Sequence, residues 1–486
     1  MYLGIDLGTS GLKLLLLDAQ HRVHASVDAP LTLQRPHPTW SEQQPHDWWQ
    51  ALASAVAQLR AAAPQAWPQV RAIGLSGQMH GAVVLDDASQ VLRPAILWND
   101  GRSELQCAAL ERAVLDARQI TGNLAMPGFT APKLLWLREH EPDLFAKIKK
   151  VLLPKDWLRL QLTGEFVSEM SDASGTLWLD VARRDWSEPM LAACGLNLSH
   201  MPRLVEGSQP SGQLRPALAQ QWGLSSGVMV AGGGGDNAAS AVGIGAANPG
   251  QGFVSLGTSG VVFRVSQAYQ PAPELAVHAF AHALPQRWHQ MSVMLSAASA
   301  FGWVTQLTGS QDEAQLAQKV AELPLAQRAL APLFLPYLSG ERTPHNNPNA
   351  CGVLMGLRSE HTAADLGYAV MEGVTFGLVD GLRAMGQSEP SQVPMALVGG
   401  GARSDAWAQL LADGLACPLQ RPEGAPAAAA LGAARLAWLA DGGPLDEVCQ
   451  NLPISHRFEP EAAGVQLLAE RYPRFRALYP ALAPLF

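Results

Sequence analysis

The chain has 486 residues, of which 48% are hydrophobic and 16% charged, and its formal net charge is -8. Because domains run to roughly 100–250 residues, this length predicts two globular domains. The acidic balance and the lack of a long basic run argue against nucleic acid as a partner. No apolar stretch of about 18 uninterrupted residues occurs, so we expect no membrane partner.

The chain opens with a predicted strand–turn–strand unit. Residues 2–6 form a short apolar strand that ends in Asp6, residues 8–11 make a tight turn, and residues 12–17 resume as a strand. The exposed amides and hydroxyls of such a turn can receive phosphate oxygens. A helix is predicted next, from Trp48 up to Pro64.

Two strand-like runs then end in polar residues, SGQMHG at 76–81 and ILWNDGR at 96–102. They offer hydrogen-bonding groups beside apolar faces: Gln78, Met79, His80, Trp98, Asn99, Asp100 and Arg102. A polyol or sugar needs this mixture. Each motif alone is weak, because a single histidine in a loop is most often only solvated. Together, at two strand ends, the motifs favour a sugar site.

Four glycines, Gly232 to Gly235, separate a predicted strand at 228–231 from a predicted small-residue helix. Asp236 therefore lies at a strand-to-helix junction, where a carboxylate can accept a proton from an alcohol. The alternative is an ordinary N-cap aspartate. The glycines favour a functional role, because they cost stability and indicate close approach of a ligand.

After a break in regular structure at 246–252, residues 253–265 repeat the opening unit. The pentapeptide LGTSG occurs at residues 7–11 and again at 256–260. Strands flank both copies and each copy opens one half of the chain, so we interpret them as equivalent turns of two similar domains rather than a coincidence. Two such turns facing each other would clamp a polyphosphate.

The second half contains two further features. Residues 395–420 read as strand, glycine turn at 398–404, helix and strand, which is typical of nucleotide-binding junctions, although an ordinary tight turn explains the glycines equally well. A buried helix is predicted at 427–440. The loop at 334–348 contains Glu341 and Arg342, for which we favour a structural ion pair.

The sequence lacks the motifs of several classes of binding site. The sequence has no GxxxxGK[ST] motif and no GxGxxG after a strand, which disfavours P-loop and dinucleotide folds. The five cysteines form no CxxC pair, which is typical of reduced thiols in a cytoplasmic enzyme. Any metal is expected to be Mg²⁺ that arrives with a nucleotide.

Three segments resemble the FGGY carbohydrate kinases, which belong to the actin-like ATPase superfamily. GIDLGTSGLK resembles the first phosphate hairpin, while GFTAPKLLWLREH at 128–140 and GVLMGLRSEHTAADLGYAVMEG at 352–373 resemble the two family signatures. The resemblance implies two α/β domains of the actin-like (ribonuclease H-like) fold around a central cleft. Residues 1–245 would bind the sugar, and residues 246–486, with C-terminal helices, would bind ATP.

Within the family, the sugar motifs look most like the members that phosphorylate D-xylulose at O5 with ATP and Mg²⁺. The resemblance implies that Asp236 is the general base and that Asp6 is a catalytic residue that holds Mg²⁺ through water. The implied sugar-contacting residues are Met79, His80, Trp98, Asp100, Arg102, Asp236 and Asn237. The implied phosphate and nucleotide positions are Thr9, Ser10, Lys13, Gly257, Thr258, Ser259, Gly400, Gly401 and Asp405.

Three alternatives stay open: a sibling kinase acting on ribulose, another ketose, gluconate or glycerol; a heat-shock-type ATPase on the same fold; and a non-catalytic sugar sensor. The family usually has three glycines before the base, and we expect the fourth to be absorbed at the end of the strand. The resemblance leaves a homodimer open, although no surface in the sequence identifies an interface.

Overall fold

The N-terminal unit forms the predicted hairpin. β1 (Tyr2–Leu7) and β2 (Gly11–Leu17) pair antiparallel, with Leu7 opposite Leu12. The second copy of the pentapeptide joins β16 (Gly252–Leu256) to β17 (Gly260–Ser266) in a second antiparallel hairpin, with Leu256 opposite Gly260. The computed structural model describes residues 1–387 and 389–486.

Each hairpin lies within a seven-stranded mixed sheet, and the two sheets repeat one order of strands. In the first sheet β1 pairs parallel with β5, β5 with β14, and β14 antiparallel with β13. In the second, β16 pairs parallel with β22, β22 with β23, and β23 antiparallel with β24. The other bounds are β3 (Val23–Pro30), β5 (Ala72–Gly77), β13 (Pro210–Gln213), β14 (Met229–Ala231), β15 (Gly234–Gly235), β18 (His278–Ala281), β19 (Trp288–Met294), β22 (Met395–Val398), β23 (Leu419–Pro422) and β24 (Ile454–Phe458). The matching order confirms that two similarly folded halves make up the chain.

Within the described residues, five two-stranded sheets lie outside the two large sheets. They are β4 (Glu42–Gln43) with β7 (Ala95–Ile96), β6 (Val83–Leu85) with β8 (Lys150–Leu152), β9 (Val167–Glu169) with β12 (Arg203–Val205), β10 (Leu179–Asp180) with β11 (Asp185–Trp186), and β20 (Leu333–Leu335) with β21 (Val353–Met355).

Helices cover the sheets. Their bounds are α1 (Pro45–Ala62), α2 (Glu104–Ala113), α3 (Ala117–Thr121), α4 (Thr130–His140), α5 (Pro142–Phe145), α6 (Pro154–Thr163), α7 (Met170–Ser174), α8 (Glu188–Ala193), α9 (Pro216–Trp222), α10 (Asp236–Ile244), α11 (Ala298–Leu307), α12 (Glu313–Ala321), α13 (Leu325–Arg328), α14 (Ala363–Ala384), α15 (Asp405–Leu415), α16 (Ala428–Ala440), α17 (Leu445–Val448) and α18 (Ala462–Leu482). The helices predicted after Asp47, after the glycine run and at 427–440 are confirmed as α1, α10 and α16.

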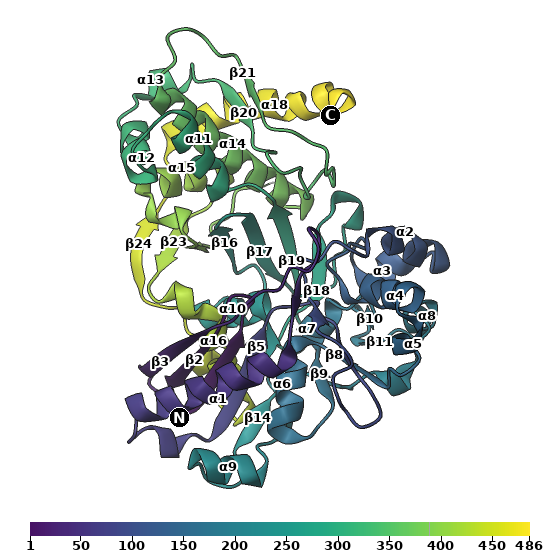
Figure 1. Ribbon diagram of the computed structural model, residues 1–486. Helices are drawn as coiled ribbons and strands as arrows, with labels where there is room; N and C mark the ends of the chain where they lie inside the picture. The colour runs from purple at the N-terminus through teal and green to yellow at the C-terminus, as the bar shows by residue number, and fades with distance from the viewer. Residues whose placement is uncertain (388) are drawn as a thin grey trace.

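Helices α10 and α16 lie between the two sheets (Figure 1). We call residues 1–245 the first lobe and residues 246–486 the second lobe. The sheet of the first lobe lies below these two helices, and helices α11–α15 and α18 of the second lobe lie above them. Although α16 comes from the second half of the sequence, it packs on the first sheet, where Leu15 and Trp438 share one hydrophobic core. Helices α10 and α16 also approach each other closely, because each presents a glycine to the backbone of the other. A Cβ on Gly432 would lie 1.8 Å from the carbonyl oxygen of Ala239, and one on Gly243 would lie 1.9 Å from that of Ala428.

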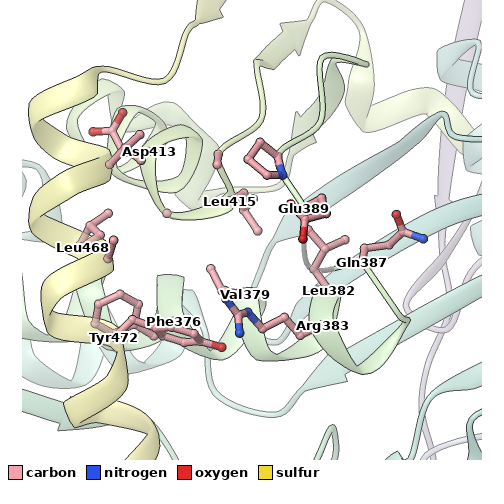
Figure 2. A pocket seen from close by; sticks show the side chains of 15 residues that line it. Phe376, Val379, Leu382, Arg383, Gln387, Glu389, Asp413, Leu415, Leu468 and Tyr472 are labelled. Carbon is pink, nitrogen blue, oxygen red and sulfur yellow. The ribbon is translucent and has the colours of Figure 1, made fainter.

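Helices α14, α15 and α18 enclose a hollow in the second lobe (Figure 2). Its wall is mostly apolar, and the guanidinium of Arg383 lies 4.9 Å from the ring centre of Tyr472. This hollow contains none of the residues that the sequence predicts for the sugar or the nucleotide. Among the described helices, none is both long and apolar enough to cross a membrane.

Candidate active site

The first LGTSG turn is tied to the motif at 76–81. The hydroxyl of Thr9 donates to Oε1 of Gln78 at 2.9 Å, and the indole N–H of Trp98 donates to the same hydroxyl at 2.9 Å. Gln43 donates to the backbone carbonyl of Thr9 at 2.7 Å. The turn, SGQMHG and WNDGR therefore meet in space. The sequence predicted that the two motifs form one site, but it did not predict their contact with the turn.

Asp236 and Asp6 face one another closely enough for their charges to interact. Asp236 is the first residue of α10, and its Oδ1 accepts hydrogen bonds from the backbone N–H and the side-chain amide of Asn237 at 2.7 and 3.0 Å. Burial, together with the charge of Asp6, raises the pKa of Asp236 to about 6. Burial also raises the pKa of Asp6 to about 6, against the opposing effects of Ser76 and Lys13. The N-cap residue is Gly235, so the alternative reading of Asp236 as an N-cap is wrong.

Two of the four glycines make room for the backbone of the protein itself. Gly233 has a φ of 79°, which interrupts the strand after β14 before β15 pairs with β5. A Cβ on Gly233 would lie 2.0 Å from the carbonyl oxygen of Leu75, and one on Gly232 would lie 2.3 Å from that of Glu206. The close approach that the glycines indicated is thus to neighbouring backbone at these two positions. The interruption lets α10 begin at Asp236.

Lys133 fixes the backbone of His80. Its Nζ donates to the carbonyls of His80 and Gly128, each at 2.8 Å, and the hydroxyl of Thr130 donates to the His80 carbonyl at 3.1 Å. His80 has a φ of 69°, a conformation that is uncommon outside glycine. The sequence placed Lys133 in a family signature but gave no signal for this contact, because the two residues are far apart in the chain.

The ring of His80 is neutral and oriented. Its Nδ1 lies 2.7 Å from the carbonyl oxygen of Gly175. Because a carbonyl only accepts, Nδ1 carries the hydrogen and Nε2 is left as an acceptor. Burial lowers the pKa of His80 to about 3. Met79 lies beside the glycine run, since a Cβ on Gly235 would be 2.9 Å from its sulfur.

Asp100 and Arg102 bind each other. Both guanidinium contacts are short, Nε to Oδ1 at 2.9 Å and Nη2 to Oδ2 at 2.7 Å, and Asp100 also accepts from the backbone N–H of Ser41 at 2.6 Å. Arg102 also pairs with Glu42 at 2.7 Å and lies 3.7 Å from the ring centre of Trp40. This pair shapes the loop after Trp98, whereas its own contact with sugar stays a prediction.

The second LGTSG turn is tied to helix α11 instead of to the sugar motifs. The backbone carbonyl of Thr258 accepts hydrogen bonds from the N–H of Ala297 at 2.9 Å and from the hydroxyl of Ser299 at 2.8 Å, while the N–H of Ala298 reaches the carbonyl of Gly257 at 2.8 Å. Thr258 and Ser259 are exposed.

The start of α11 borders a hollow of about 400 Å³, within the range of roughly 300–1,000 Å³ typical of small-molecule sites. Its lining residues are Ala298, Phe301, Glu313, Ala314, Ala317, Gly400, Gly401, Arg403, Ser404 and Trp407. Sequence reasoning found the turn at 398–404, which contains both glycines and Arg403. It missed Phe301 and Glu313, which lie in α11 and α12 and show no local nucleotide pattern.

Two predicted nucleotide residues are held in ion pairs. Lys13 pairs with Asp28 at 2.7 Å, and Asp405 pairs with Arg421 at 2.8 Å. Asp405 is not among the residues that line the hollow beside Gly400. The structure therefore brings Gly400 and Gly401 together with the second turn but points the Asp405 carboxylate toward β23.

Asp6 fits a magnesium ion. Its Oδ1 is buried and has no hydrogen-bond partner within residues 1–387 and 389–486. An unpaired carboxylate oxygen beside a second carboxyl suits a hard cation. No cluster of three or more His, Cys, Asp or Glu side chains able to hold a metal occurs in the described residues. The protein thus offers few ligands, which is how Mg²⁺ is commonly held together with a nucleotide.

Comparison with known proteins identifies the class. Residues 1–243 match the N-terminal domain of the FGGY family of carbohydrate kinases, and residues 252–440 match its C-terminal domain. The chain belongs to this family. It is therefore a sugar kinase with the actin-like α/β fold, and the heat-shock-type ATPase is set aside.

Individual relatives narrow the comparison. The chain is 51% identical over 488 residues to the xylulose kinase of Escherichia coli strain K12, and the match covers 100% of both chains. A Brucella ovis crystal structure described as a xyloylose kinase superposes with a TM-score of 0.96 at 49% identity, covering 100% of both chains. The crystal structure of xylulose kinase from Rhodospirillum rubrum gives a TM-score of 0.91 at 29% identity, covering 100% of this chain and 99% of that one.

Proposed function

We propose that this sugar kinase transfers the γ-phosphoryl group of ATP to O5 of D-xylulose, giving D-xylulose 5-phosphate and ADP. Full-length similarity to xylulose kinases supports the substrate. The observation that carries the proposal is Asp236, a carboxyl with a raised pKa of about 6 beside Asp6 and the His80 motif.

Asp236 is the general base. Its carboxylate accepts the proton of O5 as that oxygen attacks the γ-phosphorus and the bond from phosphorus to the β–γ bridging oxygen breaks. A pKa near 6 leaves most of the carboxylate ionised at neutral pH while keeping it basic. Asn237 supports this role because its backbone N–H and its side-chain amide both donate to Oδ1 of Asp236 and so fix the orientation of the carboxylate.

The sugar is held mainly by the first lobe. His80 accepts a hydrogen bond from a sugar hydroxyl through Nε2, since its Nδ1 is bound to Gly175. Met79 and Trp98 supply apolar surface for the C–H groups of the sugar. Asp100 and Arg102 keep the Trp98 loop in place through their ion pair. We place the domain boundary at 245/246, between α10 and β16.

ATP is held mainly by the second lobe. The adenosine part occupies the hollow beside Gly400 and Gly401, and the phosphates reach the two LGTSG turns. The phosphate contacts are assigned to Thr9, Ser10, Lys13, Gly257, Thr258 and Ser259. Asp405 keeps Arg421 beside this site through its ion pair rather than by contact with ATP. Amides and hydroxyls aimed at the transferring group stabilise the charge on its oxygens.

Magnesium completes the site. Asp6 would hold it, through water, with the unpartnered Oδ1. When bound, Mg²⁺ neutralises charge on the phosphate oxygens. The five cysteines are all free thiols, which supports a reducing, cytoplasmic setting for the enzyme.

The deciding experiment measures ADP release from Mg²⁺-ATP with D-xylulose, D-ribulose, L-ribulose, gluconate and glycerol. We expect kcat/KM for D-xylulose to exceed that of each other substrate by at least about tenfold, the discrimination that one or two pocket contacts supply. Preference for another member of the panel would keep the kinase and Asp236 but overturn the assigned sugar. No turnover with any of them would favour the sugar sensor.

A further inference from the structure

Arg342 is a cation without a carboxylate partner among the described residues. Its Nη1 lies 3.4 Å from Nε2 of His278. The neighbouring Glu341 uses Oε1 to accept the backbone N–H groups of Leu295 at 3.0 Å and Arg342 at 2.7 Å. The ion pair that the sequence favoured for Glu341 and Arg342 is therefore not formed between their side chains in the described part of the chain.

The groups around the guanidinium are neutral near pH 7. Burial raises the pKa of Glu341 to about 8, and it lowers the pKa of His278 well below its usual range. Burial also lowers the pKa of Arg342 itself, and the residue keeps only part of its surface exposed to solvent. An uncompensated charge in such surroundings is costly unless a ligand supplies accepting oxygens.

The loop on either side of Arg342 is anchored. Thr343 donates its hydroxyl to the carbonyl of Ala276 at 2.8 Å and its backbone N–H to the carbonyl of Val293 at 3.1 Å. Together with the Glu341 contact to Leu295, these bonds fix the position from which the guanidinium extends. A binding group held in advance by its neighbours loses little freedom when a ligand arrives.

One cluster of rings connects Arg342 with the proposed sugar site. His278 stacks on Phe280 with ring centres 5.5 Å apart. Phe129 lies 5.7 Å from the ring centre of His278 and 4.6 Å from that of His80. The charge of Arg342 also contributes to the lowered pKa of His80. This ring cluster therefore links the guanidinium with the ring of His80.

We propose that Arg342 is a sugar-binding residue supplied by the second lobe, whose guanidinium donates to O1 and to the C2 carbonyl oxygen of D-xylulose. This inference rests on the proposed function, which assigns O5 to Asp236. Arg342 then meets the opposite end of the same sugar. Hydroxyl and carbonyl oxygens are acceptors, and the planar guanidinium presents two parallel donors to such a pair.

The test compares R342Q and R342K with the wild type on D-xylulose and on 1-deoxy-D-xylulose, which lacks O1. Because hydrogen bonds to a charged donor are strong, R342Q should raise KM for D-xylulose roughly ten- to a hundredfold and leave KM for ATP nearly unchanged. The rise should be at least about threefold smaller with 1-deoxy-D-xylulose, which offers one oxygen fewer. R342K, which keeps the charge, should lie between wild type and R342Q.

R358Q is the matched control, since Arg358 lies in the same lobe and its side chain is 65% exposed. Titration calorimetry of D-xylulose without ATP gives the binding loss directly, and ADP binding shows that each variant is folded. If R342Q misfolds, R342K carries the test. An unchanged KM, or equal penalties on the two sugars, would overturn the proposal for Arg342 alone. A wild type inactive on D-xylulose would overturn the proposed function as well.

Discussion

The two LGTSG turns share five residues and one position in their sheets, yet their surroundings differ. In the first, the hydroxyl of Thr9 is fully engaged between Gln78 and Trp98. In the second, the structure ties only the backbone of Thr258 to α11 and leaves the residue exposed. Identical local sequence therefore gives a hairpin in both halves, but not one register, since Leu7 pairs with Leu12 while Leu256 pairs with Gly260. The segments that follow in each half decide what the turn can bind.

The same contrast applies to the helices after each sheet. Asp236 begins α10 and Asp405 begins α15. Asp236 has a raised pKa of about 6 beside Asp6, whereas Asp405 is paired with Arg421 at 2.8 Å. A carboxylate at the start of a helix is thus made basic in one half and neutralised by an ion pair in the other.

The largest expected effect separates these two carboxylates. D236A should lower kcat by about 10²–10⁴-fold, the range for loss of a general base, with the fold intact. D405A should leave kcat at saturating ATP far less affected, because its carboxylate faces Arg421. Steady-state kinetics of both variants, with thermal unfolding as the check on folding, measure the difference. Equal kcat values for D236A and wild type would remove Asp236 from the mechanism.

A second test concerns the contact between α10 and α16, in which each helix presents a glycine to a carbonyl oxygen of the other. G243A and G432A each push a Cβ against a carbonyl oxygen of the facing helix. We expect each to lower the free energy of unfolding by about 1–3 kcal/mol, as overpacking does, measured by urea denaturation. A429S on the half-buried side of α16 is the control. Stability equal to wild type in both glycine variants would show that the contact is looser than the structure has it.

A third test compares the threonine hydroxyls of the two LGTSG turns. T9V and T258V each remove a hydroxyl and keep the shape of the side chain. T9V should raise both KM values: that for ATP because a phosphate contact is lost, and that for the sugar, by up to about tenfold, because Gln78 and Trp98 lose a partner. T258V should raise mainly the KM for ATP. Paired kinetics with each substrate varied in turn decide between them. The opposite pattern would mean that the turns are assigned to the wrong ligands.

The sequence predicted the parts of this comparison that are local. Alternating apolar runs and glycine turns identified both hairpins, α1, α10 and α16, because such elements are set by nearby residues. Polar residues at two strand ends also indicated that Gln78 and Trp98 belong to one site, whereas the contact of both with Thr9 was not predicted. The site residues at turns and junctions were found because a turn displays its residue types in one short stretch of sequence.

Contacts between distant segments could not be predicted from the sequence. Nothing in it showed that Lys133 holds the carbonyl of His80, or that α16 would cross to the first sheet. The glycine run was read as room for a ligand, while Gly232 and Gly233 make room for neighbouring backbone. Each of these depends on which segments meet in space, and a single sequence carries no record of that.

The smallest expected effect tests β19, which lies between β17 and the edge strand β18 of the second sheet. His289 is buried against Phe263 with ring centres 4.4 Å apart, and neither ring nitrogen has a hydrogen-bond partner in the described chain. Burial lowers its pKa from 6.5 to about 3. Between these values the unfolded state binds the proton and the folded state does not, so stability falls as the pH falls from about 6.5.

H289F should remove this contribution. The unfolding free energy of the wild type, relative to H289F, should decrease on acidification by up to about 1.4 kcal/mol per pH unit below pH 6.5, since that is the effect of one proton. Urea denaturation of both proteins at pH 7.5, 6 and 5 measures the difference, and the comparison cancels the opposite contributions of Asp6 and Asp236, whose raised pKa values favour the folded state in acid. A difference that stays constant with pH would mean that His289 takes up its proton in the folded protein, and that this edge of the second sheet admits water.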